Sequence, residues 1–168
     1  EGAEHVVGFP ENRLIDSAAA LGMRPIITRT ERVAVNIADG FARATNGERL
    51  LPCVAQYGPG AEAAFGAVAQ AYGDRSPILL VPTEYAVPEQ DAGPSFRSEH
   101  AYRPITRFAA TLNSPEAGPQ TFRRALNAVR GVRNGPVLVA VANDVMNGAP
   151  GAADWDVVTA TPHRSLAA

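Results

Sequence analysis

The chain has 168 residues, a formal net charge of −2, a pI near 5.9 and 46% hydrophobic residues. This length suffices for one domain with a buried core, and the slightly acidic balance offers no basic footprint for nucleic acid. No apolar run approaches the ~20 residues of a membrane span and no secretory signal opens the sequence, so we expect a cytoplasmic domain with neither nucleic acid nor a membrane as partner.

Reactive side chains are few. All 15 basic residues are arginines, so a Schiff base to a lysine of this chain is excluded. The three histidines are scattered, and no Cys/His cluster has zinc-ligand spacing. The single cysteine, Cys53, lies in an apolar run, which favours a buried structural thiol over a nucleophile.

The chain opens with a short strand from His5 to Phe9. A turn follows, and Glu11 or Asn12 begins a helix that Gly22 ends.

The next stretch predicts strand, turn and helix. The apolar run Pro25–Ile27 leads to Thr30, whose hydroxyl can cap a helix, and Asn46-Gly47 ends that helix. Its apolar face is predicted to contain Val33, Ala34, Ile37, Ala38, Phe41 and Ala42.

Glu31 therefore falls where strand gives way to helix. In open α/β sheets this is the edge at which ligands bind. The alternative is that an acid in the first turn only offsets the helix macrodipole.

A second strand–turn–helix unit follows. A strand spans residues 50–56 and an Ala-rich helix spans residues 61–72, with Tyr57-Gly58-Pro59-Gly60 between them. Gly58 and Gly60 would let the backbone approach a ligand closely, and the alternative is an ordinary tight turn. The turn fits neither a Walker loop nor the Gly-x-Gly-x-x-Gly pattern.

The remaining elements complete the sheet. Strands are predicted at residues 78–81, 105–109 and 136–141, a helix at 114–130, and one long loop, functional or mobile, over residues 83–102. About six strands alternating with helices predict a three-layer α/β/α fold with a mostly parallel sheet. Residues 148–168 are rich in Gly, Ala, Pro and Thr, which is typical of a linker.

Several motifs together resemble the pyrimidine-binding domain of thiamine diphosphate (ThDP) enzymes, in the acetolactate synthase and 2-oxo acid decarboxylase group. That pattern has an acidic residue, then Ala-Asp/Glu-Gly-Tyr/Phe-Ala-Arg, then a Gly. Here it reads Glu31, Ala38-Asp39-Gly40-Phe41-Ala42-Arg43 and Gly47. The resemblance continues, in family order, at residues 6–10, 58–61, 71–77, 103–107, 135–139 and 143–146.

The resemblance implies a role for each candidate residue. Glu31 would donate or share a proton with N1′ of the aminopyrimidine, in a reaction that decarboxylates or ligates a 2-oxo acid. Phe9, Pro10 and Pro59 would line the pyrimidine or the substrate space, beside Gly58 and Gly60. Ordinary turn and core packing is the alternative for Phe9, Pro10 and Pro59.

The rest of the cofactor site would lie outside this sequence. The family binds the diphosphate through Mg²⁺ on a second domain, using Gly-Asp-Gly and a later Asn, and neither occurs here, so we expect no metal ligand in this chain. Residues 1–147 would form the pyrimidine-binding domain, without the helix that precedes the first strand in the family, and residues 148–168 would lead to the second domain. The family pairs its chains, which implies a homodimer or higher oligomer with the Glu31 helix and the Ala-rich helix at the junction.

Three departures keep another interpretation open. Acetolactate synthases have Gly-Gly at Glu11-Asn12, Asn near Ala63, and Phe-Gln at Phe96-Arg97. The resemblance therefore does not specify acetolactate synthase itself. The competing hypothesis is a non-catalytic α/β domain that binds a nucleotide or serves assembly and keeps the fold.

Overall fold

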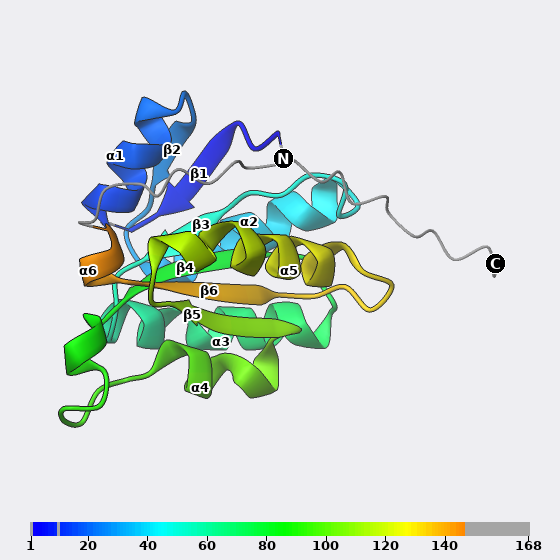
Figure 1. Ribbon diagram of the computed structural model, residues 1–168. Coiled ribbons are helices and arrows are strands. Elements are labelled where there is room, and N and C mark those ends of the chain that lie inside the picture. Colours follow the sequence, from blue (N-terminus) through cyan, green and yellow to red (C-terminus); the bar gives the residue numbers. More distant parts are fainter. Residues whose placement is uncertain (1, 10, 147–168) are drawn as a thin grey trace.

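Six parallel strands form one sheet in the order β2-β1-β3-β4-β6-β5 (Figure 1). The computed structural model describes residues 2–9 and 11–146, so Pro10 and the predicted linker lie outside the described residues. The strands are β1 (His5–Gly8), β2 (Arg24–Ile27), β3 (Cys53–Ala55), β4 (Leu79–Glu84), β5 (Phe108–Leu112) and β6 (Val137–Ala142). Every pairing is parallel, which confirms the predicted α/β class.

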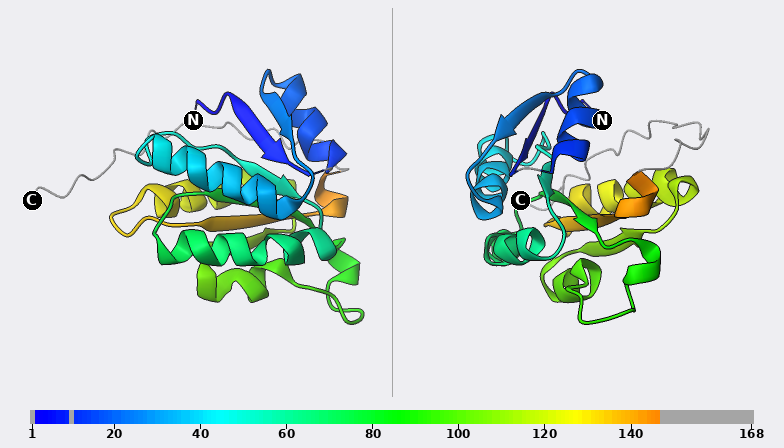
Figure 2. Two further views of the ribbon diagram at one scale, coloured as in Figure 1. Left: turned by 180° about the vertical axis from the view of Figure 1, so that it is seen from behind. Right: turned by 90° about the vertical axis from the view of Figure 1, so that its left-hand side faces the viewer.

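Helices cover both faces of the sheet (Figure 2). The α-helices are α1 (Asn12–Ala20), α2 (Glu31–Ala44), α3 (Pro59–Gly73), α4 (Ser98–Tyr102), α5 (Gly118–Arg130) and α6 (Asn143–Met146). Short 3₁₀ turns are η1 (Val87–Glu89), η2 (Arg103–Ile105) and η3 (Pro115–Ala117). Helices α2, α3 and α4 lie on one face, and α1 and α5 lie on the other.

Each face has its own hydrophobic cluster. On the α2–α3 face alanines dominate: Ala34, Ala38, Ala42, Ala64, Ala67 and Ala71 are all buried beneath the two helices. On the α1–α5 face larger side chains such as Ile15, Leu79 and Val129 fill the space. Because alanine projects so little, α2 and α3 lie close to the sheet and side by side.

The inner face of α2 differs from the predicted one. Val33 and Ile37 are 44% and 37% exposed, whereas Val35 is buried together with the alanines. The prediction of one apolar face that contains both the alanines and Val33 and Ile37 is wrong, because the helix turns its small residues toward the sheet and turns Val33 and Ile37 outward. Its ends are as predicted: Thr30 accepts a hydrogen bond from Val33 N at 3.3 Å, and Asn46 and Gly47 have φ values of 52° and 73°.

Residues 83–102 are more ordered than the single loop that the sequence predicts. Strand β4 continues to Glu84, and η1 and α4 follow. The fully buried Glu84 carboxylate accepts hydrogen bonds from Tyr85 N at 3.1 Å and Ser98 N at 3.0 Å. The Gln90 side chain donates hydrogen bonds to the Tyr85 carbonyl and to Asn113 Oδ1, and it accepts one from Arg97. Polar contacts of this kind organise the segment, and the hydrophobic pattern of the sequence does not reveal them.

Two predicted boundaries shift. The strand predicted over residues 50–56 is only Cys53–Ala55, and α3 begins at Pro59, because proline is well suited to the first helical position. Among the described residues, no helix is both long and apolar enough to cross a bilayer.

Candidate functional site

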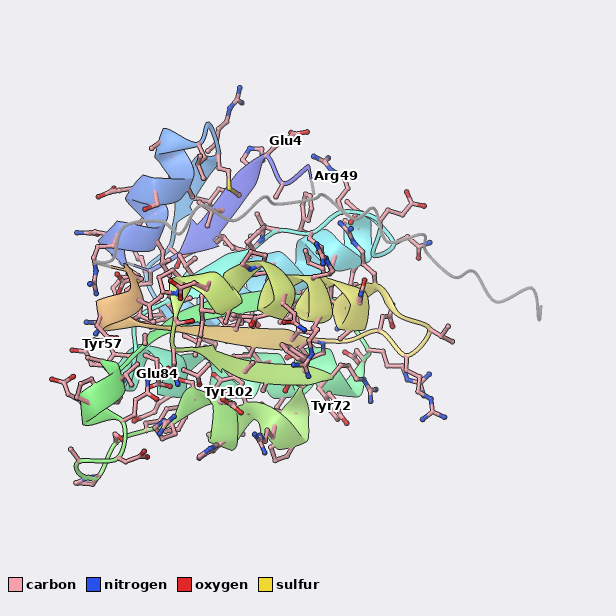
Figure 3. All side chains as sticks on the ribbon, viewed as in Figure 1. Glu4, Arg49, Tyr57, Tyr72, Glu84 and Tyr102 are labelled. Atoms are coloured by element: carbon pink, nitrogen blue, oxygen red, sulfur yellow. The ribbon has the colours of Figure 1, made fainter. Side chains whose placement is uncertain are left out.

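The candidate residues follow β1, β2 and β3, three adjacent strands whose carboxyl ends lie at the same edge of the sheet. The chain leaves β1 for α1 on one face of the sheet and leaves β3 for α3 on the other, although β1 and β3 are neighbours. Such a switch point is where ligands bind in open α/β sheets. Figure 3 shows Tyr57 and Glu84 at this end, and Glu4, Arg49 and Tyr72 toward the opposite one.

Glu31 is the first residue of α2, directly after the turn that follows β2. The Thr28 hydroxyl, 3.2 Å from the Gly8 carbonyl and 2.9 Å from the Thr30 carbonyl, holds this turn against the end of β1. The α2 macrodipole favours a negative charge at this position. The sequence prediction that Glu31 lies where strand gives way to helix is confirmed.

The Glu31 side chain reaches across to α3. A Cβ built on Gly60 would lie 2.9 Å from Glu31 Oε1 and 3.1 Å from Gln56 Cβ, so the carboxylate rests against the Gly60 backbone. In residues 2–9 and 11–146, no hydrogen bond or ion pair to this half-buried carboxylate is found. Its oxygens are therefore available to a ligand.

Gly58 and Pro59 shape the turn that carries Gly60. Gly58 caps α3 with a φ of 59°, a conformation that disfavours side chains, and Pro59 follows as the first helical residue. The Tyr85 hydroxyl lies 3.2 Å from where a Gly58 Cβ would be, and the Tyr57 and Tyr85 rings meet edge to face at 4.9 Å. The turn therefore packs against Tyr85, the residue directly after β4.

The two remaining predicted residues follow β1. Phe9 is half-buried immediately after β1, at the same edge of the sheet as Glu31. Pro10, the other residue predicted to line the pyrimidine, lies outside the described residues. Contacts of Phe9 and Pro10 with a ligand stay predictions.

A buried polar chain that the sequence patterns did not identify lies beneath the turn. Thr83 Oγ1 accepts a hydrogen bond from Tyr57 N at 2.9 Å and lies 3.3 Å from Glu11 Oε2. Thr83 is fully buried and Glu11 is 6% exposed. The polar pair Thr83-Glu84 after an apolar strand is the same kind of signal that indicated Glu31, but the predicted strand stopped at Val81.

Two buried groups near the site stay protonated at neutral pH. Burial, and then the negative charge of Glu31, raise the pKa of the Cys53 thiol far above its ordinary value. Burial, and then Cys53, raise the pKa of the Tyr102 hydroxyl, which donates a hydrogen bond to the Ala61 carbonyl in the first turn of α3. Cys53 is therefore a structural thiol, as its apolar surroundings predicted.

The arrangement combines a carboxylate with no hydrogen-bond or ion-pair partner among the described residues, a glycine backbone beside it, and a helix start held by the hydrogen bond between Tyr57 N and Thr83. The ligand that the sequence resemblance implies for it is one edge of an aminopyrimidine ring. Among the described residues, no group of three or more His, Cys, Asp or Glu side chains is placed so that it could hold a metal ion.

One departure from the acetolactate synthase pattern, Arg97, is explained by its contacts in the fold. Arg97 donates to the Gln90 side chain and backbone and to Asp91, and Arg103 is largely exposed and pairs with Glu99. Arg97 therefore helps to fix the fold of the segment after β4.

Comparison with known proteins finds relatives that align with most of the chain. The profile of the family described as "Thiamine pyrophosphate enzyme, N-terminal TPP binding domain" matches residues 1–107. The chain is 35% identical over 155 residues to the "Probable acetolactate synthase large subunit" of Methanocaldococcus jannaschii and 32% identical over 153 residues to the acetolactate synthase isozyme 3 large subunit of Escherichia coli. Each alignment covers 88% of this chain and 26% of the relative, so the chain spans about a quarter of the length of these curated relatives.

The fold also has solved counterparts. The crystal structure of benzoylformate decarboxylase from Polynucleobacter necessarius superposes with a TM-score of 0.78 at 19% identity, covering 94% of this chain and 30% of that one. At this identity the match establishes the three-layer α/β/α fold.

Proposed function

The chain belongs to the thiamine pyrophosphate enzymes as an N-terminal TPP binding domain, and from this premise we propose that Glu31 is its catalytic residue, acting on the aminopyrimidine of ThDP. The observation that carries the proposal is the Glu31 carboxylate, which lies against Gly60 at the carboxyl edge of the sheet with no protein donor among the described residues. A carboxyl group so placed can hydrogen-bond a ring nitrogen and pass a proton to it.

Bound ThDP supplies the electron sink that lets a 2-oxo acid lose carbon dioxide, for decarboxylation or carboligation. The protein residues bind and orient it. Glu31 holds the proton at one carboxylate oxygen. Gly60 permits the close approach of the ring, and Gly58 and Pro59 set the direction of the helix start that faces it. Phe9 and Pro10 would border the ring or the substrate from the β1 side.

The diphosphate and its Mg²⁺ would be held by a domain other than residues 1–147, as the resemblance to the family implies. Residues 148–168 would lead toward that domain. We place the complete protein in the cytoplasm, with 2-oxo acids as substrates and neither nucleic acid nor a membrane as partner.

We further propose a homodimer or higher homo-oligomer in which α2 and α3 form part of the contact. Their exposed apolar side chains, Val33, Ile37 and Phe65, support this surface. The buried alanines of the two helices do not contribute to this surface, because they lie in the chain's own core: Ala34, Ala38, Ala42, Ala64 and Ala67 are at most 2% exposed.

The test of the proposed function is Glu31→Gln in the complete protein, because glutamine keeps the shape but cannot transfer the proton. We expect turnover of a panel of 2-oxo acids, followed as carbon dioxide release, to fall by about 10²- to 10⁴-fold while the calorimetric Kd for ThDP with Mg²⁺ changes far less. The matched control is Glu62→Gln, which removes an exposed acid from the first turn of α3 and should retain turnover. Unchanged turnover in Glu31→Gln would refute the role.

A further inference from the structure

The hydroxyl of Thr83 occupies a central position beneath the proposed site. It has one hydrogen to donate and lone pairs with which to accept. Because it accepts from the Tyr57 amide at 2.9 Å, its own hydrogen is free to point to Glu11 Oε2, 3.3 Å away, and a carboxylate can only accept. Glu11 thus orients the hydroxyl, and the hydroxyl holds the amide.

This chain of bonds crosses three adjacent strands. Glu11 follows β1, Tyr57 follows β3, and Thr83 lies near the end of β4. Glu11 is the residue before α1 but makes no side-chain cap to that helix. Its carboxylate reaches across the end of β3 instead and accepts the hydrogen bond from Thr83.

The Glu11 carboxylate is itself held in place. Arg13 Nε lies 3.4 Å from Glu11 Oε1, and Arg13 also donates to Asn143 Oδ1 at 2.8 Å, just after β6. The charge on the nearly buried Glu11 is therefore compensated, and its position is tied to the opposite side of β4. The hydroxyl of Thr83 consequently has a fixed acceptor.

The Tyr57 amide, which Thr83 holds, lies directly before the start of α3. Tyr57 immediately precedes Gly58, the cap of α3, and Gly60 carries the backbone against which Glu31 rests. A shift of the Tyr57 amide would move the start of α3, and with it the gap between Gly60 and Glu31. The Cβ that would come within 2.9 Å of Glu31 Oε1 shows how little room there is for such a shift.

We propose that Glu11 and Thr83 are positioning residues for the Glu31 site: they fix the turn between β3 and α3 so that Gly60 keeps its distance from the Glu31 carboxylate. This inference rests on the proposed function, because the distance matters only if Glu31 and Gly60 share a ligand. Neither residue contacts the ligand; both act through Tyr57.

Valine, serine and alanine substitutions in the complete protein test the inference. Thr83→Val keeps the shape of the side chain and removes the hydroxyl, and Thr83→Ser restores it. The matched control is Thr111→Val, since Thr111 Oγ1 is also buried on a strand but makes no hydrogen bond to any residue that the structure describes. For Thr83→Val we expect ThDP affinity to fall about fivefold or more, which corresponds to the loss of one net hydrogen bond. For Thr83→Ser and Thr111→Val we expect a loss of less than about twofold.

Two readouts distinguish positioning from general support of the fold. In the ligand-free protein, amide hydrogen exchange at Tyr57 should accelerate in Thr83→Val and in Glu11→Ala but not in Thr111→Val. The double variant Glu11→Ala/Thr83→Val should bind ThDP no more weakly than Thr83→Val alone, because both changes break one chain of bonds. Glu11→Gln retains an acceptor and should bind nearly as the unmodified protein does.

The contrary results are equally specific. Wild-type ThDP affinity in Thr83→Val, or fully additive losses in the double variant, would overturn the inference while leaving the role of Glu31 intact. If Thr83→Val does not fold, Glu11→Ala replaces it: an unchanged rate of amide hydrogen exchange at Tyr57 in that variant would overturn the inference. If the unmodified protein binds no ThDP, the proposed function falls and this inference falls with it.

Discussion

Glu31 and Gly60 define the site at the scale of single residues. Position 31 could be predicted from the sequence because a strand, a capping threonine and a helix pattern locate it within a residue or two. Its contact with Gly60, 29 positions later in the chain, could not, since it depends on how closely α2 and α3 approach. The same holds for Glu11 and Thr83, whose bond joins residues 72 positions apart.

Gly60→Ala tests the closeness of that contact. The added methyl group would lie 2.9 Å from Glu31 Oε1 and 3.1 Å from Gln56 Cβ, so the carboxylate must move. We expect ThDP affinity or turnover of the complete protein to fall about tenfold or more, because small displacements at a reacting centre are costly.

The control for this change lies on the same helix. A Cβ on Gly73 would meet nothing within 4 Å, so Gly73→Ala should leave binding unchanged and stabilise the fold by up to about 1 kcal/mol. Equal behaviour of the two variants in calorimetric titration would show that Gly60 does not need to be glycine.

At the scale of elements, α2 shows where a hydrophobic pattern is ambiguous. The helix has two apolar stripes: the small residues face the sheet, and Val33 and Ile37 face outward. The periodicity of the sequence reveals both stripes but does not show which of them faces the sheet. Close packing on the sheet selects the small one, and that choice becomes visible only when α3 is placed beside α2.

Two substitutions separate the stripes. Ala38→Leu should destabilise folding by about 1–3 kcal/mol through overpacking, measured by chemical denaturation. Ile37→Arg should leave folding nearly unchanged and weaken self-association, measured by sedimentation of the complete protein. Val132→Arg is the control, because Val132 is 73% exposed but lies after α5. A monomer before any substitution would contradict the proposed oligomer.

The tie between α4 and β5 should respond to pH. Burial alone would raise the pKa of Glu99, but hydrogen bonds from Arg103 at 2.6 Å and from Thr111 N at 2.9 Å outweigh it, so the pKa is lowered. A carboxylate with a lowered folded-state pKa contributes stability above its unfolded pKa, near 4.3, and that stability is lost as pH falls through the lower folded value.

Glu99→Gln should therefore cost about 1 kcal/mol of unfolding free energy at pH 7 and almost none at strongly acidic pH. Glu116→Gln, at an exposed acid in η3, serves as the control with no expected pH dependence. A difference between Glu99→Gln and the unmodified protein that does not shrink on acidification would contradict this role of the carboxylate.

At the scale of the whole molecule, alternation of apolar runs and capped helices was enough to predict a six-stranded parallel α/β fold. The strand order was not predicted, and neither was the organisation of residues 83–102. Both depend on contacts between distant segments, such as the Glu84 carboxylate with Ser98 N and Gln90 with Asn113. The departures at Glu11 and Arg97 became interpretable only once these contacts were seen.

The central claim is that this domain supplies Glu31 to the aminopyrimidine of ThDP. A crystal structure of the complete protein with ThDP and Mg²⁺ tests it most directly. The account predicts a Glu31 carboxylate oxygen about 2.5–3.2 Å from the ring nitrogen N1′, with the ring beside Gly60. A pyrimidine ring bound at another edge of the sheet, or N1′ hydrogen-bonded to a different residue with Glu31 facing solvent, would contradict it.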